Sequence, residues 1–479
     1  MSIVWQSQYN KIILSENDRD TKRRIQMKKR VLSMLLVASM TGALLAGCGP
    51  STDASTDAAA DTNTAAAGTE TAADAAATDG EAVTLKWAIW DQETTPYWNA
   101  LKEAYEAANP NVTIEMVDLG STDYMTVLAT ELSGSGSDFD VVTIKDVPGY
   151  ATLVQKNTLE SLDDYITDAG INLADFNGIT DQVTVDGSLY ELPFRSDYWL
   201  IYYNKDVFDA AGIAYPSNDM TMEDYDALAR QLTDTTYGSQ VYGCHYHTWR
   251  SAVELFGILD GKHSILDGNY DWMIPYYDMI LSEEDDGVCQ TYTDLSTEGL
   301  HYSAAFSNGN VAMMNMGSWF ISTLISNLDS GEYDSSLCGN WGIASYPHPD
   351  GAEAGSTIAT ITGLAVTSAS ANKDAAFDFV NWVSGTEGAK VMASTGNFPA
   401  IMTDDVINTI AGMAGFPTDE GSKEALNITN AYLEVPYAEN VSEINSILDT
   451  YHTSIMNREV TVEEGVASMN EQVGKILNQ

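Results

Sequence analysis

Apolar residues switch between strand-like and helical spacing along the first folded stretch of the chain. Alternation with a period of two runs through 83–90, 112–117 and 139–144, and side chains of a strand point to opposite faces in turn. Helical spacing fills the two intervals, at 97–108 and 124–132. Strands and helices in this alternating order predict βαβ units and a parallel sheet.

The ends of the first and third predicted strands are candidate functional positions. Ligands in parallel α/β sheets bind beyond the carboxyl ends of the strands. Trp90 and Asp91 close the first strand, and Asp146 lies two residues beyond Ile144 at the end of the third. Trp90 could instead point into the core, and Asp146 could instead cap a turn, so both alternatives stay open.

Similar α/β patterns continue to the end of the chain. About 397 residues follow position 82, more than one hydrophobic core usually supports. We therefore predict an α/β fold with two lobes. One is formed by 83–194 plus 357–400 and the other by 195–356 plus 401–479, with the chain crossings as a hinge. Further predicted strands are 200–203, 311–315 and 358–367, and further predicted helices are 206–211, 222–232, 319–328, 373–383, 441–451 and 462–477.

The N-terminus contains a basic stretch, an apolar run and a cysteine in that order. Basic residues follow Met27, apolar residues dominate 31–46, and an Ala-Gly pair precedes Cys48. This is the layout of a secretory signal peptide, and the run is too short to span a bilayer. We expect 1–47 to be the signal region, with Met27 as the true start. The residues that end at Cys48 resemble the bacterial lipobox.

The lipobox resemblance implies lipid on Cys48 and attachment to the outer face of the cytoplasmic membrane. Ordinary cleavage and an uncleaved anchor are the alternatives. Residues 49–82 contain mainly Ala, Thr, Asp, Ser and Gly. Such a composition buries too little apolar surface to fold, so we expect a disordered tether.

The chain is strongly acidic. It has 69 Asp and Glu against 22 Lys and Arg, and its formal net charge is −47. Nucleic-acid binding needs clustered basic residues that displace counterions, so this class of function is excluded. Polyanionic substrates are disfavoured for the same reason, whereas a neutral ligand would be indifferent to the charge. We expect no cofactor.

Three cysteines and two neighbouring histidines are candidates for covalent or metal chemistry. Cys289 and Cys338 could form a disulfide, or these two and Cys244 could be buried free thiols. His245 and His247 suggest a metal site, but no acid or cysteine lies at ligand spacing beyond them. We therefore predict no metal site.

Short motifs follow one another in a defined order over most of the chain. They are GSLYELPF at 187–194, LIYYNKDVF at 200–208, FSNGNVAM at 306–313, MGSW at 316–319, NKDAAFDF at 372–379 and GNFP at 396–399. Together they resemble the extracellular sugar-binding proteins of ABC importers, the family that includes maltose-binding protein. The resemblance implies a periplasmic-binding-protein-like fold of two lobes with a hinge and a central cleft. It also implies a carbohydrate ligand and an ABC permease as partner.

Sugar chemistry singles out aromatic and acidic residues within these motifs. A pyranose has apolar C–H faces for stacking and hydroxyls that suit carboxylates. Trp319, which follows Gly317 and Ser318, is the predicted stacking platform; packing at a helix start is the alternative. The resemblance places a sugar-binding acid at Asp197, and Arg195 could contact the ligand or neutralise that acid. It also favours a sugar-binding role for the acid after the third strand.

Four further residues complete the predicted site. The aromatic loop at 242–249 resembles a loop of the family in which an aromatic residue and a tryptophan meet the ligand, which implies Tyr246 and Trp249. Gly363 would let the backbone approach the ligand closely, or it could mark a bulge. Phe398 is a predicted neighbour of the site.

These observations predict a monomeric, lipid-anchored receptor that closes around a carbohydrate and delivers it to a permease, without a catalytic step. One alternative keeps the fold and changes the solute to a peptide or a polyamine. Another is a surface glycoside hydrolase, which would need two carboxylates as acid and base. No carboxylate pair in the sequence is singled out for that role.

Overall fold

The computed structural model describes residues 82–93, 95–134, 137–233 and 240–478. The predicted signal region, the predicted lipid site Cys48 and the predicted tether up to residue 81 lie outside the described residues. Among the helices that are described, none combines the length and the apolar character needed to cross a bilayer.

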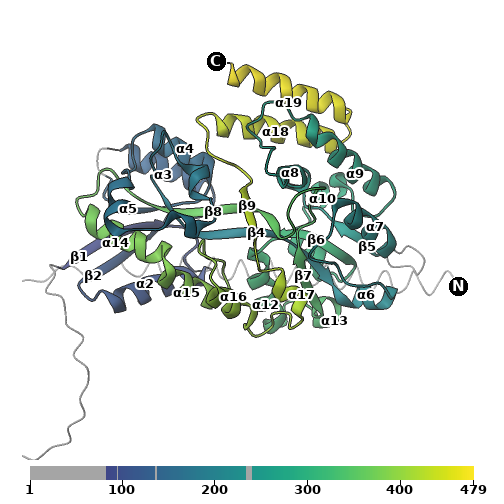
Figure 1. Ribbon diagram of the computed structural model, residues 1–479, viewed down its shortest axis with the longest axis horizontal. Coiled ribbons are helices and arrows are strands. Elements are labelled where there is room, and N and C mark those ends of the chain that lie inside the picture. Colours follow the sequence, from purple (N-terminus) through teal and green to yellow (C-terminus); the bar gives the residue numbers. More distant parts are fainter. Residues whose placement is uncertain (1–81, 94, 135–136, 234–239, 479) are drawn as a thin grey trace, which may run out of the picture. The chain divides into compact units, whose positions relative to one another are not determined.

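The described strands form one nine-stranded sheet (Figure 1). Its order is β2-β1-β3-β8-β4-β6-β5, with β7 paired to β4 and β9 paired to β8. The strands are β1 Val83–Ile89, β2 Val112–Asp118, β3 Val141–Ile144, β4 Leu192–Asn204, β5 Tyr242–His245, β6 Val311–Gly317, β7 Trp341–Ser345, β8 Ser356–Val366 and β9 Asn430–Leu433.

Two long strands join the two ends of the sheet. The predicted parallel βαβ arrangement is confirmed, because β1 pairs in parallel with both β2 and β3. β8 then pairs antiparallel with β3 and β4, and β4 continues antiparallel to β6 and β7. The predicted strand at 200–203 is thus only the end of a 13-residue strand.

The predicted helices are confirmed, although several shorter ones are missing from the prediction. The helix predicted at 222–232 begins as expected after Thr221, which forms a capping box with Asp224. The helices are α2 Pro96–Ala108, α3 Tyr124–Ser133, α4 Val147–Gln155, α5 Asp163–Ala169, α6 Lys205–Ala211, α7 Met222–Leu232, α8 Ser251–Ile258, α9 Ile274–Asp285, α10 Tyr292–Glu298, α11 Tyr302–Ser307, α12 Trp319–Ser330, α13 Ser335–Cys338, α14 Lys373–Ser384, α15 Thr386–Ser394, α16 Asp404–Ala411, α17 Glu420–Glu424, α18 Val441–Met456 and α19 Val462–Leu477, with 3-10 turns at Leu173–Phe176, Thr180–Val183 and Asp271–Met273.

β4 contributes side chains to two separate hydrophobic cores. Leu200 and Tyr202 pack into the core that includes β1, β2 and β3, whereas Trp199, Ile201 and Tyr203 pack into the core that includes α8, α9, α18 and α19. Successive side chains of a strand point to opposite faces, which explains this division. The sequence-based boundaries between the two lobes stay a prediction.

The three described cysteines are buried free thiols. Cys289 lies beside Cys244, and the thiols of this pair are within 4.8 Å of each other. Cys338 is in α13, at a separate place in the core. Of the two alternatives that the sequence left open, the Cys289–Cys338 disulfide is therefore wrong and buried free thiols are confirmed.

Candidate functional site

Two cavities adjoin the side chain of Trp319. The larger one has a volume of about 830 Å³. Its wall combines Trp90 and Tyr97 with Arg195 of β4 and with several residues of α12. The remaining lining residues are Thr95, Pro96, Ser322, Thr323, Ile325, Ser326, Asn327, Leu328, Asp329, Thr395, Asn397, Met413, Ala414 and Gly415.

The smaller cavity has a volume of about 420 Å³ and a more charged lining. Trp199, Trp249 and Trp319 supply its aromatic surface. The other lining residues are Thr248, Arg250, Ser251, Glu254, Thr360, Glu434, Val435, Asn445, Asp449, His452 and Thr453. Both volumes fall within or near the range of small-molecule binding pockets.

Trp319 is therefore a wall shared by both cavities. It begins α12, directly after the end of β6. Gly317 makes this position possible, since a Cβ atom there would lie only 2.0 Å from the indole ring. The ring meets Trp199 edge-on at 5.6 Å and is tilted against Trp249 at 6.2 Å. The three tryptophans form a partly rigid aromatic surface.

An ion pair lies beneath the larger cavity. Nη2 of Arg195 is 2.6 Å from Oδ2 of Asp197, and Oγ of Ser318 donates a 2.9 Å hydrogen bond to Oδ1. Burial raises the pKa of Asp197, while the charge of Arg195 and the bond from Ser318 act against that rise. The guanidinium also lies 5.7 Å from the centre of the Tyr97 ring. Arg195 lines the cavity, and Asp197 holds it there.

Trp90 lies at the boundary between core and cavity. It is 8% exposed, lines the larger cavity and packs edge-on against Trp98 and Tyr124. Asp91 has a left-handed backbone with φ 47°, and its N–H donates to Oδ1 of Asp118 at 3.1 Å. Asp91 is not among the residues that line either cavity.

Asp146 is placed as a helix cap. It precedes α4 and accepts a 2.7 Å hydrogen bond from the backbone N–H of Gly149. It lines neither of the two cavities. Asp146 is therefore positioned as the alternative interpretation expected, as a cap. Its short acidic side chain accepts a hydrogen bond from a backbone N–H of the first helical turn that has no partner within the helix.

The two residues predicted from the aromatic loop have different surroundings. Trp249 is 40% exposed and lines the smaller cavity. Tyr246 is 5% exposed and packs between Tyr225 and Phe256 in the core. Tyr246 directly follows the buried end of β5 and lies away from both cavities.

Gly363 and Phe398 also lie outside the cavity walls. A Cβ atom at Gly363 would be 2.1 Å from Oε2 of Glu191, so the close approach at this glycine is to a buried carboxylate. Phe398 is 1% exposed and meets Tyr198 edge-on at 6.3 Å. Its carbonyl accepts the N–H of Ser196, which ties this turn to β4.

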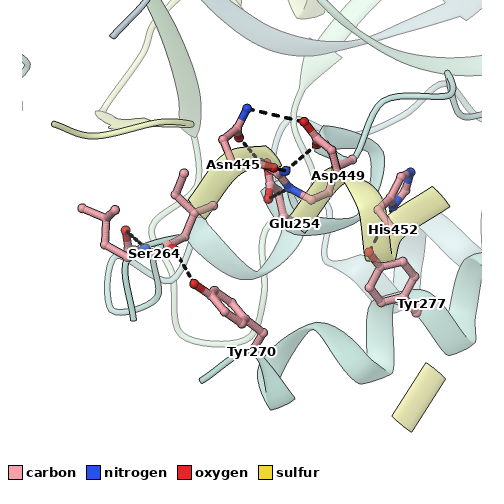
Figure 2. Close-up of polar contacts among 10 residues, drawn as sticks. Glu254, Ser264, Tyr270, Tyr277, Asn445, Asp449 and His452 are labelled. Atoms are coloured by element: carbon pink, nitrogen blue, oxygen red, sulfur yellow. Dashed lines mark hydrogen bonds and ion pairs between the residues drawn. The ribbon is translucent and has the colours of Figure 1, made fainter. Parts of the chain in front are cut away.

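A buried arginine cluster beside the smaller cavity is missing from the sequence-based prediction. Nε of Arg250 is 2.5 Å from Oε2 of Glu254, and Nη2 donates to Oδ1 of Asn445 at 2.6 Å. Arg250 also pairs with Asp449. Figure 2 shows Asn445 and Asp449 of α18 directed toward Glu254. Glu254 is only four positions from Arg250, but the partners in α18 are up to 199 positions away, so local spacing indicates only the Arg250–Glu254 pair.

The smaller cavity holds more acidic than basic groups. Glu254, Glu434 and Asp449 face a single guanidinium, that of Arg250. Burial raises the pKa of Glu434 to about 7, and the charge of Glu254 adds to this effect. Burial lowers the pKa of His452, at the same wall, to about 3, so its imidazole is neutral at ordinary pH. Its Nδ1 atom is 3.0 Å from the Tyr277 hydroxyl (Figure 2).

A sheet crossed by two long strands, with ligand-sized aromatic cavities beside them, is compatible with a solute-binding receptor. The family model of the bacterial extracellular solute-binding proteins matches residues 91–390. The chain therefore belongs to the bacterial extracellular solute-binding proteins.

Two relatives and one solved structure illustrate this membership. A sugar transporter from Rhizobium etli, solved in an open conformation, is 48% identical with a TM-score of 0.78, and the match covers 82% of this chain and 99% of that one. A putative binding protein of Brucella abortus is 27% identical over 265 residues, 52% of this chain and 61% of its own length. The mannitol-binding protein of Pseudomonas aeruginosa is 23% identical over 301 residues, 61% of this chain and 67% of its own length.

Proposed function

We propose that this protein binds a carbohydrate against Trp319 and delivers it to the permease of an ABC importer. The observation that carries the proposal is that one indole ring forms a wall of both cavities. An aromatic face with polar groups on either side suits a sugar ring, because the C–H faces of the sugar stack on the aromatic ring and its hydroxyls meet the polar groups. The sugar-transporter relative from Rhizobium etli supports this ligand class.

The polar contacts follow from the cavity walls. Arg195, oriented by Asp197, would donate to sugar hydroxyls in the larger cavity, where Trp90 offers a second aromatic edge. Trp249 would extend the stacking surface into the smaller cavity. The predicted site residues that line neither cavity would not contact the sugar. They would instead hold the backbone that positions the lining residues.

Delivery requires a receptor that changes shape when it is loaded. The lobes 83–194 plus 357–400 and 195–356 plus 401–479 would rotate about β4 and β8. A ligand held by both lobes stabilises the closed form by its difference in affinity for the two forms. The receptor acts as a monomer and performs no catalytic step. Lipid on Cys48 would keep it at the outer face of the cytoplasmic membrane.

A cationic solute is the second candidate. Three carboxyl groups against one guanidinium in the smaller cavity would favour an ammonium group. Polyamines and amino sugars carry such a group, so both belong in the same binding screen.

A thermal-shift screen tests the ligand class. Neutral sugars, polyols, amino sugars, peptides and polyamines are added in turn, and the melting temperature should rise with one class of neutral carbohydrate. Calorimetry with the best ligand then compares the wild type with Trp319→Ala. Loss of the stacking face should weaken binding by about 2 kcal/mol, roughly 30-fold in Kd.

Trp382→Ala is the matched control, because Trp382 is partly buried against Tyr105 and lines neither cavity. Its ligand affinity should stay within about twofold of the wild type. An unchanged affinity in Trp319→Ala would overturn the site, and a response only to polyamines would overturn the carbohydrate ligand.

A further inference from the structure

A compact group of metal-ligating side chains lies in the core, apart from both cavities. Cys244 belongs to β5, Glu283 to α9, and Cys289 follows the turn after that helix. One potential ligand atom of each residue lies within 4.8 Å of the other two. All three side chains are buried, with exposures of 0%, 0% and 2% respectively.

The backbone brings these residues together. The N–H of Val288 donates to the carbonyl of Glu283 at 2.8 Å, which closes the turn after α9. The N–H of Cys244 donates to the carbonyl of Val288 at 3.4 Å, which joins β5 to this turn. The group is therefore positioned by three elements of a packed core, as a preorganised site requires.

The polar atoms at this place lack ordinary partners. Within the described residues, neither oxygen of Glu283 forms a hydrogen bond of ordinary geometry, and the same holds for the hydroxyls of Tyr225 and Tyr246. The Tyr246 hydroxyl interacts with Glu283, but a fully buried carboxyl group whose contacts fall outside ordinary hydrogen-bond geometry is costly, and this favours an additional partner.

The nearest basic side chain does not supply that partner. Arg230 interacts electrostatically with Glu283 but directs Nε to Asp226 at 2.8 Å and Nη1 to Asp286 at 2.6 Å. Thiolates and carboxylates are both ligand types that zinc accepts, and thiolates favour zinc over harder divalent ions.

We propose that Cys244, Glu283 and Cys289 bind a zinc ion in the core of this protein. At zinc–ligand distances of about 2.0–2.3 Å, tetrahedral ligand atoms lie about 3.5–3.8 Å apart, compatible with a group that fits within 4.8 Å. The two thiol protons leave as the Zn–S bonds form, and the proton of the buried Glu283 carboxyl group leaves as its oxygen binds the ion. The Tyr246 hydroxyl interacts with both Cys244 and Glu283, so it would donate a hydrogen bond to a ligand of the ion.

The ion would have a structural role. It would link β5 to the end of α9 and so support the aromatic loop that carries Trp249 at the smaller cavity. Because the site is buried, the ion would be taken up as the chain folds, and metal binding would add to folding stability.

The test measures metal content in the full chain. The protein is prepared without metal under reducing conditions, refolded with one equivalent of zinc, and examined by native mass spectrometry and elemental analysis. We expect one zinc per chain and a higher melting temperature. Cys289→Ser should lose the ion, and Glu283→Gln should weaken binding at least about tenfold. Cys338→Ser is the matched control, since Cys338 is also buried but lies elsewhere, and it should bind like the wild type.

Cobalt provides a second measurement that needs no variant. Binding of Co²⁺ by the wild type should produce a near-ultraviolet charge-transfer band from thiolate to metal, and zinc should remove it. Three results would overturn the proposal. The first is a chain that binds no zinc and shows no cobalt band. The second is an equal zinc content in Cys289→Ser and the wild type. The third is a chain that is two hydrogens lighter after refolding with zinc, because Cys244 and Cys289 have formed a disulfide.

Discussion

Ser318 and Asp197 join the start of α12 to the middle of β4. The Ser318 hydroxyl donates to Oδ1 of Asp197 at 2.9 Å, and its oxygen accepts the N–H of Tyr198 at 3.2 Å. These contacts link residues 121 positions apart. They set the position of Trp319 relative to Arg195, and thereby the shape of the larger cavity.

Ser318→Ala should lower the free energy of unfolding by about 1.5–3 kcal/mol, because a buried hydrogen bond to a charged group is lost. Urea denaturation measures this change. Ser330→Ala is the control, since its exposed hydroxyl bonds only to the nearby carbonyl of Asn327. A loss of less than 0.5 kcal/mol in Ser318→Ala, on the order of a neutral surface change, would contradict the assigned role.

Arg250→Ala should destabilise the fold by about 3–5 kcal/mol, because it leaves the fully buried Glu254 without its cationic partner. Lys475→Ala removes an exposed ion pair with Glu471 and should change stability by less than about 1 kcal/mol. Both values come from chemical denaturation. Equal effects of the two substitutions would show that the buried cluster does not stabilise the protein.

Substitution by alanine should change the folding stability in opposite directions at two glycines. Gly363→Ala places a methyl group 2.1 Å from Oε2 of Glu191 and should cost about 1–3 kcal/mol. Gly474→Ala lies in α19 with no atom within 4 Å of the new methyl group. It should stabilise the protein by about 0.5–1 kcal/mol, since alanine favours the helix. Thermal melting distinguishes the two, and a stabilising Gly363→Ala would be inconsistent with the close contact.

Glu191 should make the protein less stable as the pH rises. Burial, assisted by the charge of Asp146, raises its pKa to about 8. Between its ordinary value of 4.5 and about 8, the folded carboxyl group keeps a proton that the unfolded chain releases. Stability therefore decreases with rising pH over this window, by up to about 1.4 kcal/mol per pH unit, and the effect ends above about pH 8.

Glu191→Gln removes this titration. Its unfolding free energy relative to the wild type should therefore increase from pH 5 to pH 8, as measured by urea denaturation. Glu387→Gln, at an exposed position paired with Lys390, is the matched control substitution. Parallel pH profiles of Glu191→Gln and the wild type would refute the assignment.

Most helices and strands were predictable because their signals are local. The helix after Thr221 is an example, since its capping box needs only residues within four positions. The alternation at 83–90 likewise predicts β1. β5, β7 and β9 were missing from the prediction because strands of four or five residues are too short to show a distinctive period.

The candidate site was predictable only in part. Trp319, Trp249, Trp90 and Arg195 line the cavities, and large aromatic residues beside loops indicate such positions. Tyr246 follows the same aromatic pattern but turns into the core. Which neighbour faces a cavity depends on the direction of each strand, and sequence spacing does not define that direction in a short segment.

The sequence by itself determined the alternation of strands and helices, the α/β class and the acidic character of the chain, because these depend on neighbouring residues or on composition. Tertiary structure alone decided that Arg250 meets Asp449, that Cys244 meets Cys289, and that Gly363 makes room for Glu191. Such contacts join residues far apart in the chain. They depend on how the sheet and helices pack, and local periodicity contains no information about that packing.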